Sequence, residues 1–140
     1  MTLDTNNHSV FKLNYKLVLV VKYGKGVIND NISLRLKEIF AAIAPKYNIV
    51  TDEWIHEKEQ LQIAFKAAPN TEISKCINAY KSASSRLIKK EFPEIKDMLH
   101  KGVFWSSGYF LLTIGDDNKN AINNYINIQK MKDVGEDIYD

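Results

Sequence analysis

The segment Phe11-Lys12-Leu13-Asn14-Tyr15-Lys16-Leu17-Val18-Leu19-Val20-Val21-Lys22-Tyr23 alternates in side-chain character along most of its length. A period of two residues is that of a β-strand, whose successive side chains point to opposite faces of the sheet. The odd-numbered positions are all apolar or aromatic, whereas the even-numbered positions mix lysine and asparagine with Val18 and Val20. The segment therefore predicts a long, half-buried strand with a partly polar second face, which Gly24 and Gly26 bring to an end.

Downstream of this strand, the period of the apolar residues predicts one helix and two more strands. Apolar residues recur at helical spacing over residues 31 to 46, and Asp30 or Asn31 is the expected N-cap. The period of two returns over residues 48 to 56 and again over residues 59 to 66. The first half of the chain is therefore predicted to be β-α-β-β.

The second half of the chain is predicted to add a long helix, a fourth strand and a final helix. The longest helical pattern spans residues 71 to 91, the fourth strand spans Val103 to Ile114, and the final helix spans about residues 119 to 131. This order matches an α+β fold, a ferredoxin-like or RRM-like β-α-β-β-α-β antiparallel sheet with an added C-terminal helix. Two helices are expected on one face of the sheet, which leaves the other face open for a ligand or a partner.

Length and charge limit the classes of protein to which the chain can belong. A chain of 140 residues is the size of one domain. We expect a flexible arm at residues 1–8, a domain at residues 9–132 and an acidic tail at residues 133–140. The formal net charge is +2, so a nucleic-acid surface requires local clustering of lysine and arginine.

Cysteine usage and hydropathy point to the cytoplasm. Cys76 is the only cysteine, which excludes an internal disulfide and fits a reducing compartment. The polar N-terminus lacks the pattern of a signal peptide, and no apolar run is long enough to cross a bilayer. We therefore expect a cytoplasmic protein with no membrane partner.

Three local motifs stand in order along the chain. The first is a helical run with the signature Lys81-Ser82-Ala83-Ser84-Ser85-Arg86, the second is Phe104-Trp105-Ser106-Ser107-Gly108-Tyr109-Phe110, and the third is Tyr125-Ile126-Asn127-Ile128-Gln129. With these motifs and this order of elements, the chain resembles the single-tyrosine HUH transposases of small bacterial insertion sequences. The resemblance covers nearly all of residues 9 to 131.

The resemblance implies a specific chemistry and a specific substrate. Members of that family recognise imperfect DNA hairpins at the ends of their element and cut single-stranded DNA through a 5′-phosphotyrosine link. A His-hydrophobic-His strand and a glutamine four residues after the tyrosine hold Mg²⁺ or Mn²⁺. The family works as homodimers, in which the tyrosine helix often completes the partner's site.

Carried over position by position, the resemblance assigns four residues. Tyr125 matches the nucleophilic tyrosine, and Gln129, about one helical turn later, matches the third metal ligand. Gln60 and Gln62 stand at the two histidine positions, with Leu61 as the hydrophobic residue between them. The period of two directs both glutamine side chains away from the core. Without the resemblance, the glutamines would be ordinary polar residues of a solvated strand and Tyr125 a half-buried aromatic residue of a helix.

Glutamine at both histidine positions is expected to weaken the metal site. A glutamine offers a neutral amide oxygen, a weaker ligand than imidazole for Mn²⁺-type ions, and Mg²⁺ sites usually use carboxylates and phosphates. We expect Gln60, Gln62 and Gln129 to form a degraded site that binds Mg²⁺ or Mn²⁺ weakly or not at all, so that strand cleavage is impaired. The alternative is that the DNA phosphate supplies the missing ligands and the three glutamines, with a divalent ion, still work poorly.

Basic and hydroxyl side chains supply a candidate nucleic-acid surface. On the long helix, serines stand between lysines and an arginine, and such side chains bind phosphate oxygens. A second basic set lies on the first strand. The candidate residues are Lys12, Lys16, Lys75, Lys81, Ser82, Ser85, Arg86 and Lys89. The alternative for the helical residues is an ordinary solvated helix face.

Two functions from different classes follow. The first is a transposase-like protein of an insertion sequence, a homodimer that binds hairpin or single-stranded DNA and uses Tyr125 in impaired, metal-dependent strand cleavage and transfer. The second is a non-catalytic regulator, derived from a transposase, that binds DNA or RNA hairpins. A vestigial copy with no retained role is a third hypothesis. Whether the chain is an enzyme depends on the metal site.

Overall fold

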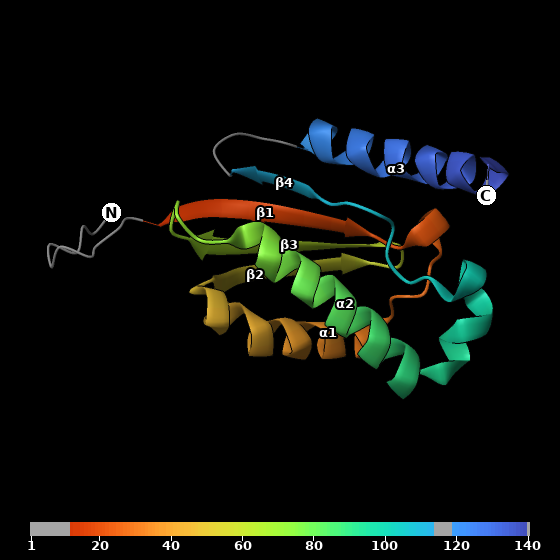
Figure 1. The fold of residues 1–140 in the computed structure, drawn as a ribbon, viewed down its shortest axis with the longest axis horizontal. Coiled ribbons are helices and arrows are strands. Elements are labelled where there is room, and N and C mark those ends of the chain that lie inside the picture. The colour runs from red at the N-terminus through yellow and green to blue at the C-terminus, as the bar shows by residue number, and fades with distance from the viewer. Residues whose placement is uncertain (1–11, 114–118, 140) are drawn as a thin grey trace, which may run out of the picture.

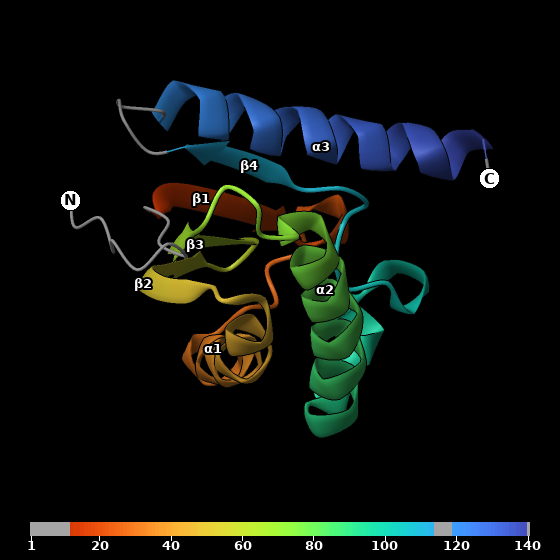
Figure 2. The same cartoon turned by 60° about the vertical axis from the view of Figure 1, so that its left-hand side comes forward.

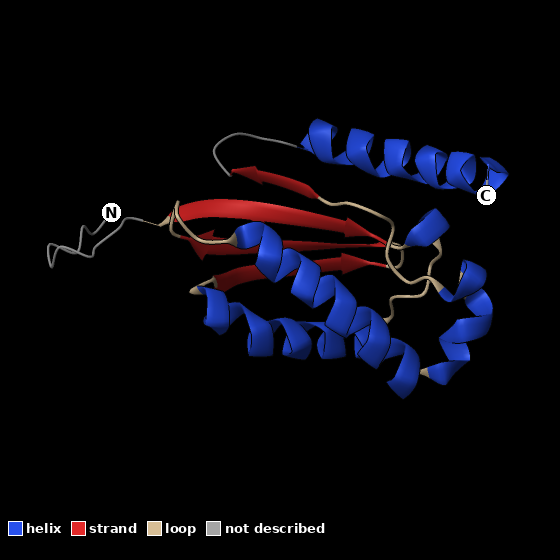
Figure 3. Ribbon diagram, viewed as in Figure 1, coloured by secondary structure: helices blue, strands red, loops and turns tan. Residues whose placement is uncertain are grey.

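The computed structural model of the chain describes residues 12–113 and 119–139 and has an α+β fold (Figures 1 and 3). The predicted class, with its added C-terminal helix, is confirmed. The elements are β1 (Leu13–Val20), α1 (Asp30–Ile43), β2 (Val50–Glu57), β3 (Gln60–Ala67), α2 (Ile73–Glu91), β4 (Phe110–Thr113) and α3 (Lys119–Tyr139). In the described residues, no helix is long and apolar enough to cross a membrane.

The strands form one sheet in the order β2-β3-β1-β4, and every neighbouring pair is antiparallel. β1 lies between β3 and β4, and Val18 pairs with Gln62 on one side and with Phe110 on the other. An inner strand pairs along both edges, and residues Leu17 to Val20 of β1 are all buried. The period of two therefore predicted an inner strand of the sheet.

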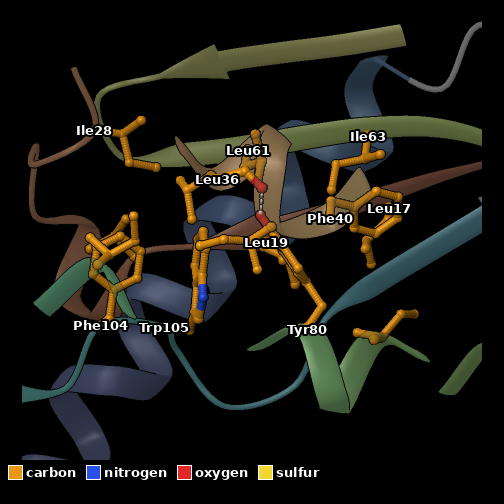
Figure 4. Packing of buried hydrophobic residues seen from close by; sticks show 14 of the residues in the cluster. Leu17, Leu19, Ile28, Leu36, Phe40, Leu61, Ile63, Tyr80, Phe104 and Trp105 are labelled. Carbon is orange, nitrogen blue, oxygen red and sulfur yellow. Dashed lines mark hydrogen bonds between the residues drawn. The ribbon is translucent and has the colours of Figure 1, made fainter. Parts of the chain in front are cut away.

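The main core lies between one face of the sheet and helices α1 and α2, which Figure 2 shows on the same side of the strands. Leu17 and Leu61 enter it from the strands, and Phe40 and Tyr80 enter it from the helices (Figure 4). The buried hydroxyl of Tyr80 donates to the carbonyl of Leu36 at 3.0 Å, which pairs this phenol inside the core. The helix predicted over residues 71 to 91 is confirmed, because α2 spans Ile73–Glu91.

The second face of the sheet is partly covered, contrary to the expectation of an open face. Val18 and Val20 pack there against Ile122 and Ile126 of α3. Figure 1 shows α3 running beside β4, far from α1 and α2. The even-numbered valines of β1 supply the apolar surface that the helix covers, whereas the β3 side of this face carries glutamines.

The predicted fourth strand, Val103 to Ile114, is too long. Pairing as a strand covers only Phe110–Thr113, preceded by a single bridge between Val21 and Trp105. Gly108 has φ +78°, a left-handed conformation that favours glycine and turns the chain out of the strand path. Ile114 lies outside the described residues.

The final helix is longer than predicted. α3 runs to Tyr139, so residues 133 to 139 of the expected acidic tail are helical. Asp133 is fully buried and does not fray into solvent. The acidic character of this stretch predicted exposure, whereas Asp133 is paired with Ser106 and Tyr23, which lie in distant parts of the chain.

Candidate functional site

The two glutamines at the expected metal-ligand positions lie on the second face of the sheet. Gln60 pairs with Val20 and Gln62 with Val18 across β1 and β3. Because Leu61 enters the main core, its two neighbours must point to the opposite face, which is the face that α3 covers. The predicted direction of both side chains is confirmed by this register.

Gln60 and Gln62 are hydrogen-bonded in a row. Gln62 Nε2 donates to Gln60 Oε1 at 2.8 Å, and Gln60 Nε2 donates to Glu57 Oε2 at 3.1 Å. Gln60 is buried, with 6% of its surface exposed. The amide oxygen of Gln60 is therefore already an acceptor, and the row ends at the carboxylate of the neighbouring strand.

Tyr125 of α3 lies on the same face of the sheet. Its ring stacks on Phe110 with centroids 5.1 Å apart and an angle of 14° between the planes. Burial of half of this residue, and secondarily the charge of Asp133, raise the pKa of Tyr125 to about 12. This environment therefore keeps the phenol of Tyr125 protonated at neutral pH.

Gln129 is buried one helical turn after Tyr125, with 3% of its surface exposed. Its Nε2 atom donates to Asp133 Oδ1 at 3.2 Å. Tyr125, Gln129 and Asp133 are successive four-residue steps and so lie on one side of the helix. The structure thus places the four residues that the resemblance assigned on one face of the sheet within a single chain.

Asp133 is a residue of this site that sequence reasoning missed. Its carboxylate accepts hydrogen bonds from Ser106 Oγ at 2.6 Å and from the backbone N–H of Tyr23 at 2.9 Å, and Lys22 Nζ lies 3.5 Å away. One signal was available: an aspartate four residues after Gln129 continues the side of the helix that carries Tyr125.

These residues do not form a set that fits Mg²⁺ or Mn²⁺. Gln60, Gln62 and Gln129 supply three neutral amides, two of which bind each other while the third binds Asp133. Within residues 12–113 and 119–139, no group of three or more His, Cys, Asp or Glu side chains could hold a metal ion. His56 lies 3.2 Å from Asp30 on the other side of the sheet.

Four of the predicted nucleic-acid-binding residues come together in a groove of about 690 Å³. This groove runs along α2 beside the short 3₁₀ segments Pro93–Met98 and His100–Gly102. We call it the basic groove. It is lined by Ser82, Ser85, Arg86, Lys89, Lys90, Lys96 and Gly102. Lys96, in the 3₁₀ segment that follows the helix, was not predicted.

The other four predicted residues lie elsewhere. Lys75 is exposed and pairs with Glu72 at 2.7 Å. Lys81 is half-buried and donates to two backbone carbonyls near β4, and burial lowers the pKa of its ammonium group. Lys16 lies on β1 opposite Leu112, and Lys12 precedes that strand at a recess near the end of α1. The structure therefore does not unite all eight residues in one surface.

Comparison with known protein families and with curated proteins finds transposases in both cases. A family model described as "Transposase IS200 like" matches residues 9–129. The chain is 27% identical over 124 residues to the ISDra2 transposase TnpA of Deinococcus radiodurans, an alignment that covers 89% of each protein.

Two solved structures resemble the fold. The crystal structure of a transposase from Deinococcus radiodurans R1 has a TM-score of 0.80 at 27% identity, and the match covers 91% of this chain and 98% of that one. The structure of a REP-associated tyrosine transposase bound to a REP hairpin has a TM-score of 0.57, with 93% and 74% of the two chains covered. At 10% identity, the second likeness shows the fold alone.

Proposed function

The chain belongs to the IS200-like transposase family, and on this premise we propose that it recognises hairpin or single-stranded DNA of an insertion sequence, with impaired strand cleavage. The observation that carries the proposal is the basic groove, where two serines and four cationic side chains line one hollow. The formal net charge is only +2, so this cluster is a local feature and not a consequence of an overall basic chain.

The chemistry of the basic groove fits a phosphate backbone. Lysine and arginine side chains neutralise phosphates, while serine hydroxyls donate to phosphate oxygens. Arg86 has the planar, two-pronged donor geometry that matches a phosphate group. A solved relative of the same fold is bound to a REP hairpin, which supports a hairpin as the form of DNA to test first.

We propose Tyr125 as the nucleophile of whatever cleavage remains. Its phenolic oxygen would form a bond to phosphorus, the bond from phosphorus to the 3′ oxygen would break, and the departing 3′ oxygen would take up a proton. With a pKa of about 12, roughly one phenol in 10⁵ is ionised at pH 7. The neutral amides of Gln60, Gln62 and Gln129 give little help in stabilising the charge that develops on the phosphate.

A second candidate function is a non-catalytic regulator that binds DNA or RNA hairpins. The hydrogen bonds that join Gln62 to Gln60 and Gln60 to Glu57 favour it, because they engage the amide oxygen and nitrogen of Gln60 and the amide nitrogen of Gln62 at the expected metal-ligand positions. The basic groove would serve both functions equally, since phosphate contacts do not depend on cleavage.

We further propose that the protein acts as a homodimer in the cytoplasm. The short strand β4 is an edge of the sheet, and an exposed edge is commonly covered by pairing with a second copy. Light scattering at several protein concentrations tests this part. A monomer at every concentration would contradict it without affecting the proposed DNA binding.

The test of the proposed function measures binding and cleavage on the same DNA. A labelled single strand with an imperfect hairpin is mixed with the protein and Mn²⁺, beside an unstructured strand of equal length. We expect preferential binding of the hairpin strand, and a slow covalent adduct that Tyr125→Phe abolishes. Hairpin binding with no adduct supports the regulator. Equal, weak binding of both strands contradicts both candidates.

A further inference from the structure

The segment between Trp105 and Gly108 is held in place from the α2 side. Trp105 Nε1 donates to Ser84 Oγ at 2.9 Å. Lys81 Nζ donates to the carbonyls of Ser106 and Gly108, at 2.8 and 2.6 Å. Lys81 and Ser84, one turn apart on α2, therefore fix both the backbone and a side chain of this segment.

The same segment is bonded to α3. Ser106 Oγ donates to Asp133 Oδ2 at 2.6 Å, the short distance of a hydrogen bond to a charged acceptor. Ser106 thus accepts from Lys81 through its carbonyl and donates to Asp133 through its hydroxyl. The helix that carries the basic groove and the helix that carries Tyr125 are bonded to one residue.

Because Asp133 is buried, its carboxylate requires specific hydrogen-bonding partners. The side chain is fully buried, and a buried carboxylate is unfavourable unless its oxygens are hydrogen-bonded and its charge is paired. The backbone N–H of Tyr23, the amide of Gln129 and the ammonium of Lys22 supply the other interactions. A shift of α3 along the sheet would leave the charge without these partners.

The conformation of Tyr23 supports the same conclusion. Tyr23 has φ +60°, a left-handed backbone conformation that is unfavourable for a side chain with a Cβ atom. This conformation directs the backbone N–H of Tyr23 to Asp133 Oδ2 at 2.9 Å. Strain of this kind persists where surrounding contacts determine the backbone, and the bond to Asp133 is one such contact.

Apolar contacts hold α3 mainly in its first half. Ile122 and Ile126 are buried against the sheet. Ile128, Met131 and Val134 are exposed, at 57%, 74% and 52% of their surface. Among the side chains described from residue 127 to residue 135, no apolar one is buried. Between residues 127 and 135, α3 is therefore positioned by its polar contacts.

We infer that Asp133 is a positioning residue, which acts through Ser106 to fix α3, and with it Tyr125, at one place on the sheet. The role of Tyr125 in cleavage rests on the proposed function, whereas the placement of the helix does not. Lys81 of α2 binds the carbonyl of Ser106. Ser106 therefore also links α2, which carries the basic groove, to α3, which carries Tyr125.

The test compares the full-length natural protein with Ser106→Ala and with Asp133→Asn. Backbone amide hydrogen exchange is measured in all three proteins. Loss of one buried hydrogen bond is expected to speed exchange in α3 by about fivefold or more, with little change in β1, β3 and α2. The pKa of Tyr125, followed by the absorbance of the phenolate, should fall from about 12 toward 10 in both variants.

Two further variants keep the test specific. Ser106→Thr retains the hydroxyl and should restore slow exchange in α3 and the raised pKa of Tyr125. Asp97→Asn removes the same charge at an exposed position in a 3₁₀ segment and should change neither measurement. Adding Ser106→Ala to Asp133→Asn should change exchange little beyond Asp133→Asn alone, because the bond between Ser106 and the carboxylate is one of the interactions that Asp133→Asn already disrupts.

Two results would overturn the inference. Unchanged exchange in α3 and an unchanged titration of Tyr125 would show that the helix keeps its place without Asp133. Faster exchange by the same factor throughout the chain, the main core included, would show that Asp133 supports global stability and positions nothing in particular.

The cleavage assay separates this inference from the proposed function. If the protein forms the covalent adduct, Ser106→Ala should slow its formation by at least about fivefold, because the loss of position outweighs the larger ionised fraction of the phenol, while the hairpin Kd stays within twofold. If the natural protein forms no adduct, the cleavage part of the proposed function fails. Hydrogen exchange and the titration of Tyr125 then still decide whether Asp133 positions α3.

Discussion

Gln62 donates its side-chain amide to the Oε1 atom of Gln60 at 2.8 Å, so the two residues at the expected metal-ligand positions bind each other. A pair of imidazoles in the same places would differ, because each neutral ring keeps one bare nitrogen for a cation. Gln60 also donates to Glu57 Oε2 at 3.1 Å, which completes a row of hydrogen bonds across β2 and β3. The local structure stabilises the amides without an ion.

The double change Gln60→His and Gln62→His is therefore expected to strengthen binding of Mn²⁺, by about tenfold or more, which corresponds to about 1.4 kcal/mol. Isothermal titration calorimetry with Mn²⁺ alone measures this. The matched control is Gln60→Asn with Gln62→Asn, which keeps two amides and should bind no more tightly than the natural protein. No gain from the histidines would contradict the assignment of this part of β3.

Arg86→Ala is expected to weaken hairpin binding and to make it less dependent on salt. Each phosphate contact that is removed lowers the slope of log K against log salt by about 1, and the loss should be similar for different sequences. Fluorescence anisotropy over a range of salt concentrations gives the slope. Lys75→Ala removes the same charge from α2 outside the basic groove and should leave the slope nearly unchanged. Equal effects of the two variants would argue against the groove.

Trp105→Phe is expected to lower the free energy of unfolding by about 1–3 kcal/mol, because it removes a buried N–H donor and part of a packed ring. Trp105 has 6% of its surface exposed and donates to Ser84 Oγ at 2.9 Å. Urea denaturation measures the change. Trp54→Phe is the control: Trp54 bonds Ser33 at 3.0 Å but is less buried, so a smaller loss is expected. A larger loss at Trp54 would contradict the placement of Trp105 in the core.

The stability of the protein is expected to fall at high pH partly because of Tyr125. The pKa of Tyr125 is about 12 in the folded chain and about 10 when exposed, so the unfolded chain loses this proton first as pH rises. The contribution is complete below pH 10 and is lost as pH rises through 12. In Tyr125→Phe, the free energy of unfolding should therefore fall less across this window. An identical pH dependence of urea denaturation in both proteins would contradict a half-buried phenol.

The parts of the fold that sequence predicted are those with local causes. The alternation of β1 and the apolar stripe of α2 are set by which side chains can be buried at a fixed period, and both were predicted correctly. The register of Gln60 and Gln62 followed from the same rule, because Leu61 between them has to enter the core.

The parts that sequence did not predict depend on contacts between distant residues. The late start of the β4 pairing, at Phe110, follows from Gly108 and from Lys81, which lies far away on α2 and bonds two carbonyls of the preceding segment. Asp133 is buried because Ser106 and Tyr23 donate to it, and no periodicity reports such partners. Sequence also did not predict which basic residues of α2 line the basic groove and which support the fold. Lys81 is half-buried and binds two backbone carbonyls, whereas Arg86 and Lys89 line the groove.

The most direct test compares covalent adduct formation on a hairpin-bearing single strand, in Mn²⁺, between the natural protein and the double variant Gln60→His and Gln62→His. We predict that both proteins bind the hairpin and that adduct formation is slow or undetectable in the natural protein and clearly faster in the variant. An adduct that forms as fast in the natural protein as in the variant would contradict impaired cleavage. Failure of both proteins to bind the hairpin would contradict the proposed function itself.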